Sequence, residues 1–136
     1  VLSRTVRETR TIPGGGCCET RMARAIDAEV PNTPGKKALA MEGFARALRA
    51  LPAIIADNGG FDASELVTRL RAAHARGQDT AGLDMVKGDV ADMTELGIRE
   101  SFKSKLHVLV SAAEAAEMIL RVDDIVRCAP RKREGQ

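Results

Sequence analysis

Three consecutive glycines, Gly14–Gly16, stand directly before a helical pattern and constrain the fold of this chain more than any other feature. Glycine loses more backbone freedom on folding than any other residue, so an ordered run implies that something approaches the backbone closely. Cys18, Met22 and Ile26 then recur at the spacing of one helix face. A glycine turn before a helix N-terminus can bind a phosphate or another anion. A plain loop-to-helix junction without a ligand is the alternative, and the triplet alone favours it.

Composition narrows the class of protein. The 136 residues form one domain at most, and 44% hydrophobic residues with mixed charges indicate a globular chain. A net charge of +2 and the absence of Trp and Tyr argue against a nucleic-acid partner. No apolar run approaches the roughly 20 residues that span a bilayer. Three cysteines do not make a disulfide framework, which favours a reducing intracellular compartment.

The middle of the chain predicts two helices. Thr33-Pro34 is a start signal for the first helix, and Asn58–Gly60 stops it. Asp62–Glu65 resembles a capping box before the second helix, which Gly77 ends. The predicted buried faces are Met41, Phe44, Leu48, Leu51 and Ile55 in the first helix, and Leu66, Val67, Leu70 and Ala73 in the second.

The last third of the chain predicts a hairpin and a long helix. Between Thr80 and Asp92 apolar and polar residues alternate, as in a strand, and Lys87-Gly88 is the predicted hairpin turn. Ser101 can cap the helix that follows, and Val122–Val126 predicts a short strand before a polar tail at 131–136. The predicted buried face of that helix is Phe102, Leu106, Val110, Ala113 and Ile119 or Leu120. The fold class is therefore mainly α, with a small β hairpin and a short C-terminal strand.

Several stretches together resemble the group II chaperonins, which include the thermosome and the eukaryotic cytosolic chaperonin TRiC/CCT. They are Gly14–Gly16 with Glu19, Ala53–Asp62, Gly82–Asp84 through Gly88, Asp92-Met93 and Leu96–Ser101. Thr33–Lys36, Ala45–Arg49, Leu70–His74 and Ala129–Arg133 most resemble the beta-type subunit. The resemblance runs through nearly all 136 residues in order. It implies that residues 1–136 are the C-terminal part of an equatorial domain, which binds ATP and makes most ring contacts.

The resemblance also implies a nucleotide-binding role for particular residues. Gly15, the middle glycine of Gly14–Gly16, would lie against the nucleotide, Glu100 would reach the ribose, and Lys105 would lie near the same pocket. A carboxylate can accept hydrogen bonds from both ribose hydroxyls. Without the resemblance, Glu100 would be an acid at a helix start and Lys105 a solvated residue.

By the same resemblance, the parent subunit uses ATP or ADP with Mg²⁺, but the chain starts after the phosphate-binding loop and the catalytic acids. We therefore expect no catalytic residue in this chain and no ATPase activity from it alone. The implied partners are paralogous subunits in a double ring and unfolded clients such as actin and tubulin, in the cytoplasm. We expect neither nucleic acid nor membrane as a partner. Two alternatives are a free-standing helical interaction module without ATP use and an unrelated phosphate-binding enzyme domain.

Other candidate sites carry less weight. Cys17, Cys18 and Cys128 could bind zinc, but adjacent cysteines lack the usual ligand gap, and Cys18 fits better as a small core residue. We predict that His74 lies at the surface and that His107 has no special role. No metal site is expected. The apolar faces of the helices cannot all be buried by so few elements, so we expect the isolated chain to self-associate.

Overall fold

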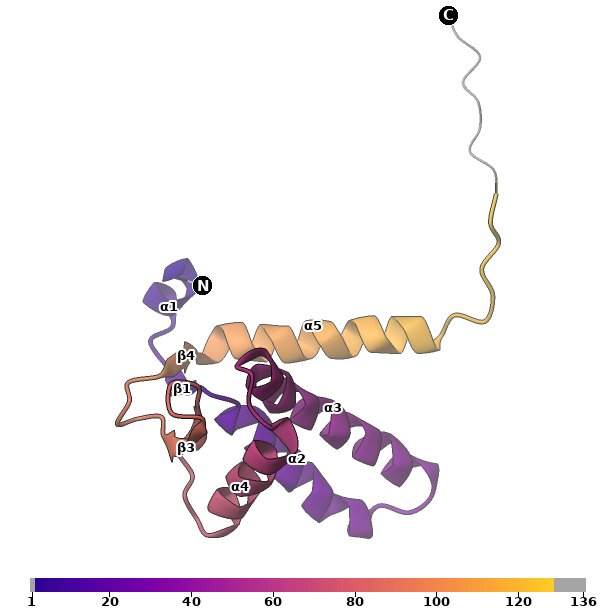
Figure 1. Cartoon of the computed structure of the whole chain (residues 1–136). Coiled ribbons are helices and arrows are strands. Elements are labelled where there is room, and N and C mark those ends of the chain that lie inside the picture. Colours follow the sequence, from indigo (N-terminus) through magenta and orange to yellow (C-terminus); the bar gives the residue numbers. More distant parts are fainter. Residues whose placement is uncertain (1, 129–136) are drawn as a thin grey trace, which may run out of the picture.

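The computed structural model describes residues 2–128, and most of them are helical (Figure 1). The helices are α1 (Leu2–Arg7), α2 (Cys17–Glu29), α3 (Lys36–Asn58), α4 (Ala63–Ala75) and α5 (Phe102–Leu120), and a 3₁₀ turn at Val30–Asn32 joins α2 to α3. The strands are β1 (Thr11–Pro13), β2 (Ala81–Asp84), β3 (Asp89–Asp92) and β4 (Arg99–Ser101). The mainly helical class predicted from the sequence is confirmed.

The strands form two small antiparallel sheets. In one sheet, β2 pairs with β3, Ala81 lies opposite Asp92, and the turn that joins the strands ends at Gly88. This is the predicted hairpin. In the other sheet, β1 pairs with β4, with Ile12 opposite Glu100. The second pairing joins residues that are far apart in the sequence, and no local pattern predicts it. It brings the segment before the glycine triplet beside the start of α5.

The signals that begin and end the helices act as predicted at most positions. The Asp62 side chain accepts a hydrogen bond from the Glu65 amide at 3.1 Å, and Ser101 accepts one from the Ser104 amide at 3.5 Å. These contacts satisfy amides that have no partner within the helix. Helix α3 differs slightly, because it begins at Lys36 and not at Pro34. It then continues through Pro52 to Asn58.

The core consists of two clusters that share α3. One cluster joins α3 and α4 to the β2–β3 hairpin through Ala56, Leu66, Leu70, Ala73, Ala81 and Leu83. The other joins α2 to α3 through Ala23, Ala45 and Leu48, with Leu109 of α5 packed against its edge. Leu66, Leu70 and Ala73 confirm most of the face predicted for α4, whereas Val67 is only half-buried.

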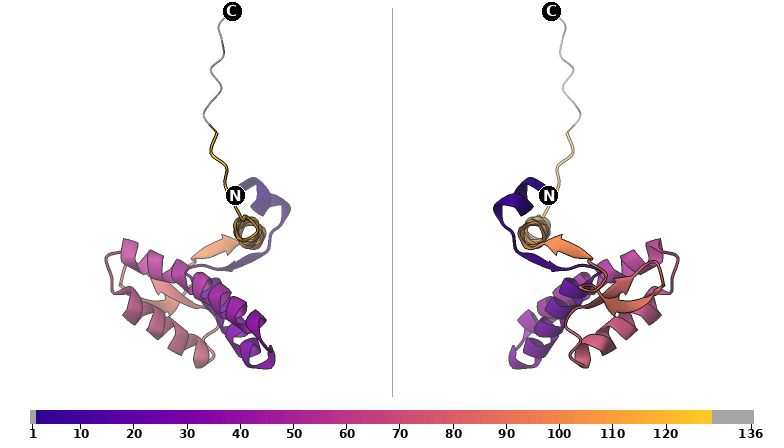
Figure 2. Two further views of the ribbon diagram at one scale, coloured as in Figure 1. Left: turned by 90° about the vertical axis from the view of Figure 1, so that its right-hand side faces the viewer. Right: turned by 90° about the vertical axis from the view of Figure 1, so that its left-hand side faces the viewer.

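Helix α5 lies along one side of the other helices and is the least buried of the long elements. Seen end-on in Figure 2, it has α1 on one side and the group of α2, α3 and α4 on another. No residue of α5 is fully buried, and the exposed fraction is 48% for Leu106 and 73% for Ile119. The predicted buried face of this helix is therefore wrong, because the chain supplies no second layer of apolar side chains to cover it.

The predicted strand at Val122–Val126 is also wrong. Residues 122–128 form neither helix nor strand within the described chain, and their side chains are exposed. A strand needs a neighbour for its backbone hydrogen bonds, and none of the described strands pairs with this segment. The polar tail predicted at 131–136 lies outside the described residues. Among residues 2–128, no helix combines the length and the apolarity that crossing a membrane requires.

Candidate functional site

The glycine triplet lies where both sheets meet the start of α2. The Gly14 amide donates a hydrogen bond to the Ile98 carbonyl at 3.0 Å, and the Leu83 amide donates to the Gly15 carbonyl at 2.8 Å. Gly15 and Gly16 have φ angles of +63° and +75°, which side chains other than glycine rarely adopt. Gly16 is the N-cap residue of α2 and gives it no side-chain hydrogen bond.

The close approach that the triplet predicts is made by the protein itself. A β-carbon on Gly15 would lie 2.6 Å from Met93 Sδ and 2.9 Å from the Leu83 amide nitrogen. A β-carbon on Gly16 would lie 2.6 Å from Cβ of Pro52 in α3. Both glycines are therefore required by internal packing, whether or not a ligand binds. Pro52 is fully buried, so α3 packs against Gly16 at this point.

Gly14 lies on the side of the triplet that faces β4. Its φ is not positive, and a β-carbon there would lie 3.4 Å from Glu100 Oε1 and 3.0 Å from Ile98 Cγ2. A side chain at Gly14 would therefore crowd Ile98 and Glu100, so the glycine lets these side chains pack closely against the triplet. Gly14 and Glu100, which are both predicted site residues, are thus neighbours in the structure.

Lys105 links Glu100 to a second carboxylate. Its ammonium lies 2.5 Å from Glu100 Oε2 and also forms an ion pair with Glu19 in the first turn of α2. The side-chain exposed fractions are 4% for Glu19, 18% for Lys105 and 39% for Glu100. Glu19 and Lys105 are thus largely shielded from water, while Glu100 still reaches the surface.

The two carboxylates fix the charge of Lys105. Burial by itself lowers the pKa of Lys105, but the hydrogen bonds and charges of Glu100 and Glu19 raise it above its ordinary value. The lysine therefore stays protonated in its shielded position. One ammonium between two carboxylates leaves a net negative charge, so this group suits hydroxyl groups or a cation better than a bare phosphate.

A hollow of about 380 Å³ opens at Glu100 and Lys105. It is lined by Thr5, Thr11, Arg99, Glu100, Ser101, Ser104, Lys105 and Val108. The glycines of the triplet are not among these residues, so Glu100 stands between the hollow and the triplet. The structure therefore groups Gly14, Glu100 and Lys105, while Gly15 and Gly16 face the core.

Glu19 is the site residue that sequence reasoning missed. Glu19 follows the glycine triplet in the motif, but the sequence alone assigns it no role. Its partner lies 86 residues away along the chain. One signal in the sequence could have identified Glu19: it lies in the helix turn directly after the glycine run, where close packing is expected. A carboxylate that is buried there needs a cation as its partner.

Two predictions about other candidate residues are wrong. His74 is 1% exposed and not at the surface, and its Nε2 donates to the Ala81 carbonyl at 2.9 Å. Cys17, with its Sγ 3.3 Å from the Asp79 carbonyl oxygen, is the core cysteine, whereas Cys18 is only half-buried. Burial raises the pKa of Cys17 to about 11, so its thiol stays protonated. Within residues 2–128, no three metal-ligating side chains gather into a cluster.

The sequence is similar to those of known chaperonins. The model of the TCP-1/cpn60 chaperonin family matches residues 1–130. The chain is 59% identical over 133 residues to T-complex protein 1 subunit beta of Bos taurus, covering 98% of this chain and 25% of the relative. It is 57% identical over 136 residues to the same subunit of Saccharomyces cerevisiae, covering 100% of this chain and 26% of the relative.

A solved structure shares the fold. The open-state monomer of a group II chaperonin from Methanococcoides burtonii matches with a TM-score of 0.80 and 33% identity, covering 82% of this chain and 28% of that one. The chain therefore spans about a quarter of the length of the curated relatives that it matches. The family model matches the sequence over residues 1–130, and the fold matches that of a solved group II chaperonin. The chain therefore belongs to the TCP-1/cpn60 chaperonin family.

Proposed function

We propose that this chain serves as part of an ATP-dependent protein-folding subunit and forms the ribose side of its nucleotide pocket. The observation that carries the proposal is the half-exposed Glu100 carboxylate, which lies beside Gly14 and is held by Lys105. A carboxylate can accept hydrogen bonds from two neighbouring hydroxyls, which matches the 2′ and 3′ positions of a ribose. The hollow of about 380 Å³ that Glu100 and Lys105 line gives the sugar room to approach.

The phosphates and Mg²⁺ would be held elsewhere in such a subunit. The resemblance assigns them to a loop and acids that are not in this sequence, and the described residues here offer no cluster of metal ligands in their place. When bound, ATP with Mg²⁺ supplies the free energy of phosphoryl transfer. This chain contributes only shape and hydrogen-bond acceptors for the sugar. The 136-residue chain by itself should therefore hydrolyse no ATP.

The proposed biological setting follows the relatives. As part of a beta-type T-complex protein 1 subunit, the chain would contact paralogous subunits in a double ring and act in the cytosol on unfolded clients such as actin and tubulin. A family match to chaperonins over residues 1–130 and identities near 60% to beta subunits support this assignment.

Nucleotide binding by a full-length subunit carrying this sequence tests the proposal. Glu100→Gln should weaken ATP binding about tenfold and reduce the preference for ATP over 2′-deoxy-ATP, because an amide is a weaker acceptor than a carboxylate. Glu95→Gln is the matched control, since Glu95 is exposed and its side chain has no described partner. Equal affinities in both variants, with folding intact, would remove Glu100 from the pocket.

A further inference from the structure

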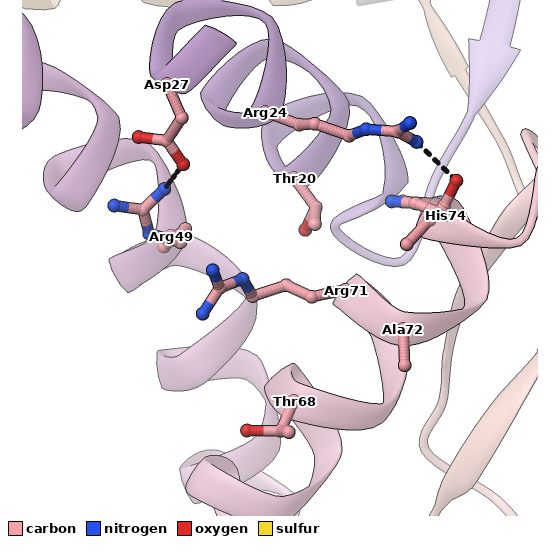
Figure 3. Close-up of a pocket in the computed structure, with 9 residues that line it drawn as sticks. Thr20, Arg24, Asp27, Arg49, Thr68, Arg71, Ala72 and His74 are labelled. Atoms are coloured by element: carbon pink, nitrogen blue, oxygen red, sulfur yellow. Dashed lines mark hydrogen bonds and ion pairs between the residues drawn. The ribbon is translucent and has the colours of Figure 1, made fainter. Parts of the chain in front are cut away.

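A second, basic cavity lies between α2, α3 and α4 (Figure 3) and shares no lining residue with the hollow at Glu100. Its volume is about 330 Å³, at the lower end of the range for small-molecule sites. Three arginines from three different helices line it: Arg24 of α2, Arg49 of α3 and Arg71 of α4. Asp27 is the one acid among the lining residues.

The charges around this cavity do not balance. Arg49 lies 2.6 Å from Asp27 and is paired, and Arg24 donates to the His74 carbonyl, which is not charged. Arg71 has no ion pair or hydrogen bond within the described chain, and Figure 3 shows its guanidinium extending from α4 towards α3. Burial lowers the pKa of His74, so that ring is neutral at pH 7 and adds no charge. Three arginines and one aspartate leave two positive charges in excess.

The free donors in the cavity suit a compact anion. A guanidinium has five N–H donors in a planar fork that matches the oxygens of phosphate, so Arg24 and Arg49 keep donors beyond their present bonds. The exposed Thr68 hydroxyl lines the same cavity, whereas the Thr20 hydroxyl already donates to the Gly16 carbonyl. Two excess charges match a dianion better than a single carboxylate.

We propose that this cavity binds a doubly charged phosphate group, with Arg71 as its main ligand and Arg24 and Arg49 beside it. The group can be free inorganic phosphate or a phosphate monoester on a small molecule, since both present the same oxygens. Binding there would neutralise the two excess positive charges that the fold holds together without a counter-charge. The site is separate from the Glu100 pocket and requires no nucleotide.

Titration calorimetry of the 136-residue chain at fixed ionic strength tests the proposal. Inorganic phosphate should bind saturably with one site per chain, and Arg71→Gln should weaken it at least tenfold. Arg46→Gln is the matched control, because Arg46 is an exposed arginine of α3 that does not line the cavity and has no described partner. Circular dichroism checks that both variants fold.

Two further probes define the ligand class. Phenyl phosphate that binds more tightly than inorganic phosphate would identify a monoester ligand, and the reverse order a free phosphate; either order supports the site. Acetate should bind at least tenfold more weakly than both, because it carries one charge. Absence of saturable phosphate binding, equal losses in Arg71→Gln and Arg46→Gln, or acetate binding as tight as phosphate binding would each overturn the proposal.

Discussion

Lys105 Nζ lies 2.5 Å from Glu100 Oε2, and the same ammonium pairs with the buried Glu19. The lysine thus ties the first turn of α2 to β4 and fixes the carboxylate that we assign to the ribose. Lys105 lines the same hollow as Glu100, which agrees with the position that the resemblance implies for it. Its ammonium is already occupied by two acids, so we expect Lys105 to affect a nucleotide only through the position of Glu100.

Removing the lysine should destabilise the fold. Lys105→Met leaves the Glu19 carboxylate buried without a cation, a change that typically costs about 3 kcal/mol. Adding Glu19→Gln to the same chain should restore much of this loss, because the uncompensated charge disappears. Urea unfolding of the two single variants and the double variant measures the coupling. Additive losses in the double variant would show that the pair contributes nothing.

The ion pair between Lys105 and Glu100 should also affect nucleotide binding, if Glu100 contacts the ribose. In a full-length subunit, Lys105→Met should reduce the preference for ATP over 2′-deoxy-ATP about tenfold, which is about 1.4 kcal/mol. Lys103→Met is the control, since Lys103 lies on the same helix turn but makes no ion pair with Glu100 or Glu19. A general loss of affinity with the preference unchanged would contradict a positioning role.

The comparison of sequence with structure separates local signals from distant ones. Asp62, Ser101 and the Lys87-Gly88 turn were predictable because each acts on amides a few residues away. The burial of His74 was not, because its hydrogen-bond acceptor is the Ala81 carbonyl in a strand that packs on α4. The pairing of Glu19 with Lys105 likewise depends on the β1–β4 sheet, for which no pattern in the sequence exists.

The glycine triplet shows why a correct motif can carry a different meaning. The need for close backbone approach was predictable, but the approaching groups are Leu83, Met93 and Pro52 of the same chain. Periodicity also predicted apolar faces on α3 and α5, and the side chains there are apolar. Whether such a face is buried depends on which segments are present to cover it, and no pattern within the helix contains that information.

Substitution at two glycines should separate packing from backbone strain. Gly15 and Gly77 both have positive φ angles, but a β-carbon on Gly77 would meet nothing within 4 Å. Gly77→Ala should therefore cost only the conformational term of about 1 kcal/mol. Gly15→Ala should cost at least about 2 kcal/mol more, because the methyl group meets Leu83 and Met93. Equal losses in urea unfolding would contradict the close packing at Gly15.

Stability should fall in mild acid because of His74. Burial lowers its pKa in the folded state below the ordinary value of 6.5, so the unfolded chain takes up a proton more readily. The neutral ring therefore stabilises the fold fully above pH 6.5, and this contribution is lost as the pH falls towards the folded-state pKa. The slope from this residue is at most about 1.4 kcal/mol per pH unit.

Urea unfolding between pH 7.5 and pH 5 measures this effect. His74→Gln removes the titrating ring, so the free energy of unfolding of that variant should depend less on pH over this range. The comparison concerns the slope alone, because the substitution also changes packing around Ala81. Identical slopes in the two chains would show that His74 titrates in the folded state as it does in the unfolded chain.

The apolar groove between α3 and α5 should drive self-association. It has a volume of about 490 Å³ and is lined mostly by apolar side chains, among them Phe44, Leu51 and Leu120, with Glu117 as the one charged lining residue. The exposed fractions are 45% for Phe44 and 85% for Leu120, and exposed apolar patches of this kind are rare on stable monomers. In the longer relatives, the remaining three quarters of the chain can cover such a face, whereas for the isolated chain the available partner is a second copy.

Sedimentation equilibrium over a range of concentrations tests this expectation. The 136-residue chain should form dimers or larger species, and Leu51→Glu should shift it towards monomer, because a carboxylate in the groove must be desolvated on association. Leu39→Glu is the control on the same helix, since Leu39 is 68% exposed and lies outside the groove. Equal shifts in both variants would assign association to another surface. A folded monomer at every concentration would show that the groove stays open in water without a partner.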